Sequence, residues 1–355
     1  MTWRNLTMSE QQKVLEAQIK KDADLGRKKR VIEEARIDRD YQNTVDGQNQ
    51  LRLFKELDLS KDDPEKVEKI IKEANDYIKS AKKNMRFINE DFDGIVPFHA
   101  NNIVLVAAVT GQGKSTITAN ICYSLLKQKK RVLVISNEEK SGDVYNRVTC
   151  LINGWGYNKH SEISDDQLEV FGKYTRAMRN NLRVVDNDSE NISGLTSSYE
   201  GITGLLNSLL GKPAIYDAIL IDYYQNVNIL SSNPSAEPWK AQEKFVNFLD
   251  DFKGKYPAPI VLMAQMKGRG KDNEVEFKDR IEGRKSVLNK CTFAFEVMAD
   301  KKNRRTEWTI HKQRFGNNVG ESFHTGWDLG KYVKYDKEFQ LKVQDLMLKK
   351  MKGMV

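Results

Sequence analysis

The spacing of apolar residues divides the chain into two parts. Residues 1 to about 60 are polar, nearly balanced in charge and only weakly periodic, which predicts helices that need a partner or a mobile extension. Beyond them Pro64 follows two aspartates, and apolar side chains recur at helical spacing up to Ala81. We expect an amphipathic helix of about 18 residues there. Its apolar stripe would pack on its own domain or on a neighbouring subunit.

From about residue 86, short apolar runs alternate with helical segments. Near-continuous apolar strands separated by helices are typical of a parallel sheet covered on both faces. The expected fold class is therefore α/β, with a mostly parallel central sheet flanked by helices after an α-helical N-terminal region. The apolar runs are 103–109, 131–136, 182–186, 217–222 and 259–265, and the closing strands are 292–300, 305–313 and 331–336.

These patterns predict four regions. They are an N-terminal helical or mobile extension (1–60), an amphipathic linker helix (61–85), the α/β domain (86–335) and a basic helical tail (336–355). The chain has no run of about 18 apolar residues and no apolar segment near its start, so we expect neither a membrane span nor a signal peptide. Its three cysteines lie far apart, which argues against a zinc module and fits a reducing cytoplasm.

The positive charge of the chain is concentrated in one segment. The net charge is +8, and between Gln265 and Arg314 there are fourteen Lys and Arg against eight Asp and Glu. A focused basic surplus indicates a polyanionic partner. A lysine-rich solvated surface is the alternative, and charge alone does not separate the two.

A glycine-rich loop follows the first apolar run. The stretch AAVTGQGKST stands between a predicted strand and a predicted helix, which is the setting of a phosphate-binding P-loop. Gly111 and Gly113 allow backbone N–H groups to face phosphate oxygens, and Lys114 would reach the β- and γ-phosphates. Ala108 replaces the usual first glycine, at a position that closes the strand. The residues expected to bind nucleotide are Thr110, Gly111, Gln112, Gly113, Lys114, Ser115 and Thr116.

Polar side chains follow three further apolar runs. Asp222 ends AILID and is the expected partner of Ser115 in binding Mg²⁺. Glu138 follows VLVIS and is the expected base for the attacking water, with Glu139 as the second choice. Gln265 ends IVLMAQ, where it would contact the γ-phosphate or the water, unless it is a structural amide. The carboxyl ends of parallel strands share one crevice, so these groups can meet.

Two basic groups come later in the chain. The polar, glycine-punctuated segment after Gln265 has almost no aromatic residues, which favours sequence-independent contact with a phosphate backbone over base stacking. In WTIHKQRFG, Lys312 and Arg314 would point to one face of a strand and present charge either to local carboxylates or to a phosphate, including one on the next subunit. The expected DNA contacts are Lys267, Arg269, Arg280, Arg284 and Lys285.

These motifs in this order resemble the DnaB-like replicative helicases, ring-forming members of the RecA-like P-loop ATPases. The resemblance covers about residues 86 to 330 and rests on AAVTGQGKST, VLVISNEE with Arg147, LIDYYQ, VLMAQ and HKQRFG. An alanine at position 108 is usual in that family. The first 60 residues resemble neither the family's helical domain nor a zinc-binding primase, which is typical of a phage or plasmid version.

The resemblance implies an ATP-driven DNA helicase that forms a homo-hexamer around single-stranded DNA, with ATP and Mg²⁺ between subunits. Lys114, Ser115 and Asp222 would serve one subunit's nucleotide, and Glu138 would activate water. Lys312 and Arg314 would reach the neighbouring site, Arg314 as an arginine finger. A separate primase and a helicase loader are the implied partners, in the bacterial cytosol.

The sequence also allows two functions other than a helicase. A RecA-like recombinase, or a DNA-binding ATPase that forms filaments without unwinding, would share most of these residues. A P-loop scaffold without activity is a third possibility, and Glu138 and Asp222 argue against it.

Overall fold

In the computed structural model the described residues are 64–156, 164–188, 196–227, 238–268, 275–283 and 285–351. The predicted extension over residues 1–60 lies outside them. The chain divides into two units, Met1–Lys72 and Glu73–Val355. The predicted amphipathic helix is confirmed as α3 (Pro64–Ala81), which runs across the boundary between the units.

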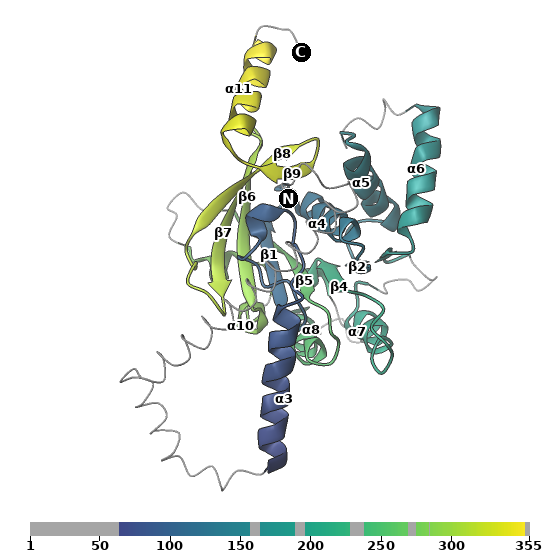
Figure 1. Cartoon of the computed structure of the whole chain (residues 1–355), viewed down its shortest axis with the longest axis vertical. Helices are drawn as coiled ribbons and strands as arrows, with labels where there is room; N and C mark the ends of the chain where they lie inside the picture. The colour runs from purple at the N-terminus through teal and green to yellow at the C-terminus, as the bar shows by residue number, and fades with distance from the viewer. Residues whose placement is uncertain are drawn as a thin grey trace, which may run out of the picture. The chain divides into compact units, whose positions relative to one another are not determined.

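Nine strands form one sheet in the second unit, in the order β3-β2-β4-β5-β1-β6-β7-β8-β9 (Figure 1). The first six in that order run parallel, and the last three continue the sheet antiparallel. The strands are β1 (Ile103–Val109), β2 (Val132–Ser136), β3 (Leu182–Val185), β4 (Ala218–Asp222), β5 (Ile260–Met266), β6 (Phe293–Asp300), β7 (Arg305–Gln313), β8 (Ser322–Asp328) and β9 (Lys331–Lys334).

The mostly parallel sheet confirms the predicted fold class. Each of the five predicted apolar runs contains a strand. Strands β1, β2, β4 and β5 are almost entirely buried and so lack polar alternation, whereas β3 has one exposed residue, Arg183. Strand β8 was not predicted, because its sequence SFHTGWD has a glycine and little apolar pattern. Among the described helices, none is long and apolar enough to cross a membrane.

Helices cover both faces of the sheet and bury two apolar clusters. On one face α4, α5 and α6 contribute residues such as Ile117, Val148 and Met178, and on the other α7 and α8 contribute Leu206 and Phe245 (Figure 1). The helices are α4 (Lys114–Lys127), α5 (Ser141–Asn153), α6 (Asp165–Met178), α7 (Tyr199–Asn207), α8 (Pro238–Lys253), α9 (Phe277–Arg280), α10 (Val287–Lys290) and α11 (Lys337–Met351), with short 3₁₀ turns at Glu90–Phe92 and Tyr224–Asn226.

The C-terminal helix α11 corresponds to the predicted basic tail. It packs on β8, where Gly326 leaves room for Phe339: a Cβ on this glycine would stand 2.5 Å from the Phe339 ring. Lys342 also pairs with Asp328 of β8 at 2.7 Å. The helix is therefore attached to the antiparallel part of the sheet.

Candidate nucleotide site

The loop between β1 and α4 has the backbone of a phosphate-binding turn. Gly111 and Gly113 have φ angles of 78° and 91°, a region that side chains disfavour. Gly113 is the N-cap of α4, and Lys114 is its first residue, so the positive end of the helix faces the loop. Ala108 is fully buried inside β1, and its position therefore belongs to the strand and not to the phosphate-facing turn.

Lys114 and Asp222 come together below this loop. Lys114 is 8% exposed, and its ammonium lies 5.6 Å from the centre of the Tyr223 ring, directly after Asp222 in the chain. Burial raises the pKa of Asp222 to about 7, while Thr118 and Lys114 oppose the rise. A buried carboxylate in this condition needs a cation to stay ionised at neutral pH.

The surroundings of Asp222 fit a magnesium ion. Thr118 donates a hydrogen bond to Oδ2 at 3.0 Å, whereas the buried Oδ1 has no hydrogen-bond partner among the described residues. Ser115 lies one turn before Thr118 on α4 and supplies the hydroxyl that such sites use. Within the described residues no group of three or more His, Cys, Asp and Glu side chains could hold a metal. The candidate donors here are one carboxylate and one hydroxyl.

Glu138 and Glu139 differ sharply in their surroundings. Glu139 forms an ion pair with Arg147 at 2.7 Å, with both side chains about one-fifth exposed. Glu138 is exposed, and its charge helps to raise the pKa values of Asp222 and Tyr223. The charge of Glu139 also raises the pKa of Asp222, more than that of Glu138 does, so both glutamates lie near this carboxylate. Glu138 is the exposed one of the two, while Glu139 is held by Arg147.

Asn137 fixes the ends of β2 and β4 side by side. Its side chain accepts a hydrogen bond from the Tyr223 N–H at 2.9 Å and donates one to the Tyr223 carbonyl at 2.8 Å, and its own N–H donates to the Asp222 carbonyl. Sequence reasoning did not single out Asn137, Thr118 or Tyr223. The available signal was position: Asn137 directly precedes Glu138, Tyr223 directly follows Asp222, and Thr118 lies one helical turn after Ser115.

Gln265 connects β5 to the phosphate loop. Its amide donates to the Thr110 hydroxyl at 2.5 Å, and its backbone is bound by the side chain of Gln225, which accepts from the Gln265 N–H and donates to its carbonyl. Gln242 in turn donates to the Gln225 carbonyl at 2.7 Å. The expected side chain thus lies at the nucleotide loop, held by two glutamines that the sequence analysis did not identify.

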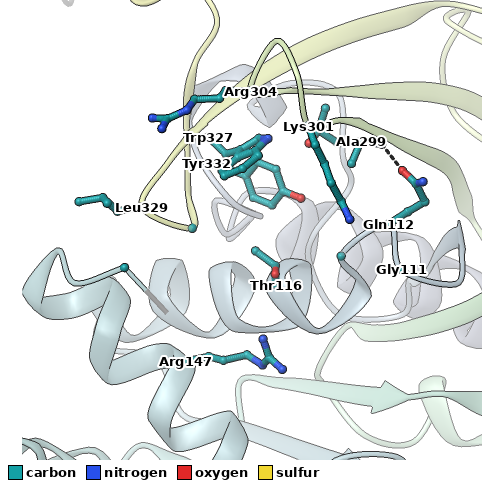
Figure 2. Close-up of a pocket in the computed structure, with 14 residues that line it drawn as sticks. Gly111, Gln112, Thr116, Arg147, Ala299, Lys301, Arg304, Trp327, Leu329 and Tyr332 are labelled. Atoms are coloured by element: carbon teal, nitrogen blue, oxygen red, sulfur yellow. Dashed lines mark hydrogen bonds between the residues drawn. The ribbon is translucent and has the colours of Figure 1, made fainter. Parts of the chain in front are cut away.

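A pocket of about 510 Å³ opens beside the phosphate loop (Figure 2). One wall is the loop itself, and the opposite wall comes from the β6–β7 turn and from β8 and β9. Gln112 crosses to this wall by accepting a hydrogen bond from the Ala299 N–H at 2.7 Å. The side chain of Lys301 extends from the turn toward the loop (Figure 2). Other lining residues include Arg147, Arg304, Trp327 and Tyr332.

Lys312 and Arg314 lie near the opposite end of the strands. Lys312 pairs with Ala294 of β6, which pairs with Leu105, four residues before the end of β1. Four strand residues span about 13 Å, so neither cation stands at its own chain's phosphate loop. Strand β7 ends at Gln313, and Lys312 donates to the carbonyls of Leu288 and Asn289. Burial and the charge of Arg314 both lower the pKa of Lys312, so the two cations interact, and their shared face stays a prediction.

Arg314 follows the end of β7 and is exposed. It lies near Tyr77 of α3, whose pKa burial raises and the Arg314 charge lowers. The next residue, Phe315, packs its ring 5.4 Å from that of Tyr77 and remains 63% exposed. The predicted finger residue is therefore on the surface of the single chain.

The basic segment after β5, residues 267–290, is only partly as predicted. Lys267 and Lys285 are exposed, and Lys285 pairs with Asp279 at 2.6 Å, which lowers the pKa of Asp279. Arg280 is a correction: it is 5% exposed and its guanidinium pairs with the buried Glu296, so it does not present charge to a nucleic acid. Arg269 and Arg284 lie outside the described residues.

Comparison with known proteins places this arrangement in one family. The family profile of the DnaB-like helicase C-terminal domain matches residues 85–276. Among curated proteins no sequence matches. One similar solved structure, described as an ATPase domain, has a TM-score of 0.60 at 14% identity, over 78% of this chain and 100% of that one.

A second similar structure is titled "The Structure Of A DnaB-Like Replicative Helicase And Its Interactions With Primase". It has a TM-score of 0.58 at 15% identity, over 87% of this chain and 77% of that one. At these identities the two structures support the fold, and the family profile covers more than half of the chain. The resemblance inferred from the motifs is thus confirmed, and the chain belongs to the DnaB-like helicases, ATP-dependent enzymes that unwind DNA in replication.

Proposed function

We propose that the chain works as a ring-shaped homo-hexamer that moves along single-stranded DNA and hydrolyses ATP at its subunit interfaces. The observation that carries this proposal is the separation within one chain between the phosphate loop and the cations Lys312 and Arg314. An arginine finger must touch the γ-phosphate to act. Since Arg314 cannot do so at its own loop, a head-to-tail neighbour has to receive it, and such contacts form a ring when the rotation between neighbours closes.

The nucleotide would lie with its phosphates on the loop and the rest of the molecule in the adjoining pocket. Backbone N–H groups of residues 110–116 and the ammonium of Lys114 would bind the phosphates. Lys301 and Arg304 line the pocket on the side away from the loop. A volume of about 510 Å³ is within the usual range of sites for small molecules.

Ser115 and Asp222 would hold Mg²⁺, which neutralises developing phosphate charge when bound. The side chains of this chain would do the rest. Glu138 would take a proton from the attacking water at its carboxylate. Gln265, tied to Thr110, would report the presence of the γ-phosphate to the segment that follows β5. Arg314 and Lys312 of the neighbouring subunit would stabilise the transferring phosphoryl group.

The segment after β5 would face the DNA in the central channel. Lys267, Lys278 and Lys285 are cations of this segment that remain exposed, and Arg269 and Arg284 also belong to the predicted set. Lysine and arginine without stacking aromatics bind the phosphate backbone whatever its sequence. A translocating enzyme requires such sequence-independent contact.

The neighbouring subunit would also bind helix α3. Ile70, Ile71 and Ile78 of its apolar stripe are 65%, 47% and 53% exposed, an arrangement that favours a partner over solvent. By its likeness to a helicase structure described with primase, we further propose a separate primase partner. We also propose that a helicase loader is a partner, that the protein works in the bacterial cytosol, and that it is of phage origin.

Particle imaging tests the assembly. The full chain would be imaged with a non-hydrolysable ATP analogue, Mg²⁺ and single-stranded DNA. Closed six-membered rings are the expected result. Open helical filaments would instead indicate a RecA-like recombinase or a DNA-binding ATPase without unwinding, and would overturn the ring.

A further inference from the structure

A buried carboxylate outside the nucleotide site joins the basic segment to the strand that precedes Arg314. Glu296 of β6 is 1% exposed. Arg280, from the short helix α9 in the basic segment, donates to it, and His311 Nε2 of β7 lies 2.9 Å from the same oxygen. Three elements that are separate in the sequence therefore meet at one carboxylate.

A bulge in β7 gives this contact its geometry. Ala294 pairs with Lys312 and Phe295 with Ile310, so His311 is the extra residue opposite β6. His311 stacks on Phe277 of α9, with ring centres 3.9 Å apart and planes inclined by 4°. Lys312 donates to carbonyls of α10. Two consecutive residues of β7 thus contact the basic segment.

The basic segment is also attached firmly to β5. Met266 and Ile281 form a β-bridge, and the Lys267 N–H donates to the Arg280 carbonyl at 2.7 Å. Arg280 therefore contacts the end of β5 through its backbone and Glu296 through its side chain. A displacement of Lys267 by bound DNA would be transmitted to β7 through Arg280.

Stability alone is a poor explanation for this charged contact. Apolar residues of similar volume often stabilise a core as well as a buried ion pair does. The Nε and Nη1 atoms of Arg280 have no hydrogen-bond partner among the described residues, so the guanidinium is held chiefly by Glu296. One carboxylate then fixes the orientation of α9 relative to β7.

We propose that Arg280, Glu296 and His311 are positioning residues that link DNA contact on the basic segment to the placement of Lys312 and Arg314. The inference rests on the proposed function, in which that segment binds DNA and those cations serve a neighbouring nucleotide. None of the three touches nucleotide or DNA. They determine whether DNA bound to one subunit accelerates hydrolysis at the next interface.

The test measures ATPase rates of the full chain with and without single-stranded oligonucleotide. Glu296→Gln removes the charge that holds Arg280. The double variant Arg280→Met, Glu296→Leu replaces the whole ion pair with apolar side chains and guards against misfolding of the single variant. The matched control is Thr325→Val on β8. It removes the acceptor of a buried hydrogen bond of 2.9 Å that Trp308 donates. Trp308 is also on β7 but lies away from the basic segment.

We expect both variants to lose stimulation by DNA on the order of tenfold, while their DNA-free ATPase rate and their DNA affinity, from fluorescence anisotropy, stay within about threefold of the original chain. Thr325→Val should keep full stimulation even if it lowers the melting temperature as much. Full stimulation in the double variant, or an equal loss in the control, would overturn the proposal. If DNA does not stimulate the ATPase of the original chain at all, both the proposed function and this further inference fail.

Discussion

The two ends of the parallel strands are built on different principles. At the carboxyl end, β1, β2, β4 and β5 bring Lys114, Glu138, Asp222 and Gln265 to one place, and hydrogen bonds within the chain hold it together. Toward the other end, past the register of Leu105, Lys312 and Arg314 provide charge without any phosphate-binding loop of their own.

This difference shows what a single chain can complete. In the proposed site the carboxyl end would bind nucleotide by itself, because the loop, the lysine and Asp222, the proposed metal-binding carboxylate, belong to the same chain. The other end carries Lys312 and Arg314, the cations proposed to stabilise the transferring phosphoryl group. Assembly would therefore control the catalytic rate and leave nucleotide binding largely unaffected.

The largest expected effect comes from separating the two ends genetically. Arg314→Ala should lower the ATPase rate by about 10³-fold or more, as for other arginine fingers, and leave binding of a fluorescent ATP analogue intact. Lys114→Ala should abolish binding. Mixed in equal amounts, the two inactive variants should regain activity, because about a quarter of the head-to-tail interfaces join an intact loop to an intact finger.

Absence of any recovery in the mixture, with subunit exchange verified by labelling, would contradict the assignment of Arg314 to the neighbouring site. Activity that survives in Arg314→Ala alone would remove the finger from the mechanism.

A smaller effect tests the carboxyl end itself. Glu138→Gln should slow hydrolysis by about 10²- to 10⁴-fold while nucleotide still binds, since a general base contributes that much. The matched variant is Glu139→Gln, which should act mainly by releasing Arg147 and therefore change the melting temperature more than the rate. A larger loss of rate in Glu139→Gln than in Glu138→Gln would exchange the two roles.

The smallest effect concerns the support behind Gln265. A Cβ at Gly283 would stand 2.6 Å from Gln242 Oε1 and 2.9 Å from Gln225 Cγ, at a φ of +77°, and Gln242 is itself buried and hydrogen-bonded. Gly283→Ala should thus lower the free energy of unfolding by about 1–3 kcal/mol through overpacking. The backbone conformation should lower it by about 1–2 kcal/mol more.

Gly211→Ala is the control for this comparison, because Gly211 has a φ of +71° and nothing within 4 Å of a built Cβ. Comparing the melting temperatures of the two variants separates the effect of overpacking from the effect of the backbone conformation. Equal decreases in melting temperature would mean that Gly283 is not packed tightly against the two glutamines.

Much of the fold was predictable because each strand carries its own signal. Buried parallel strands are apolar on both faces, so the runs around β1, β2, β3, β4 and β5 were recognisable one at a time. The site residues were predictable for a related reason: polar side chains that end such strands must meet at one edge of the sheet. Strand β8 lacked this pattern and was missed.

Long-range pairing was not predictable from local pattern. Arg280 is a basic residue in a glycine-punctuated segment, and the sequence alone cannot show that Glu296 lies beside it. The same holds for Glu139, the second choice for the base, which forms an ion pair with Arg147. A residue's charge is local information, whereas its partner depends on how distant segments pack.

The sequence by itself therefore determined the phosphate loop, the order of the strands' polar ends and the family, because these depend on short motifs and on periodicity. Only the tertiary structure decided which cations are free to act. Register and a one-residue bulge in β7 place His311 against Glu296 and Lys312 against α10, far from the chain's own phosphate loop. Strand register is set by packing across the whole sheet, and no short stretch of residues encodes it.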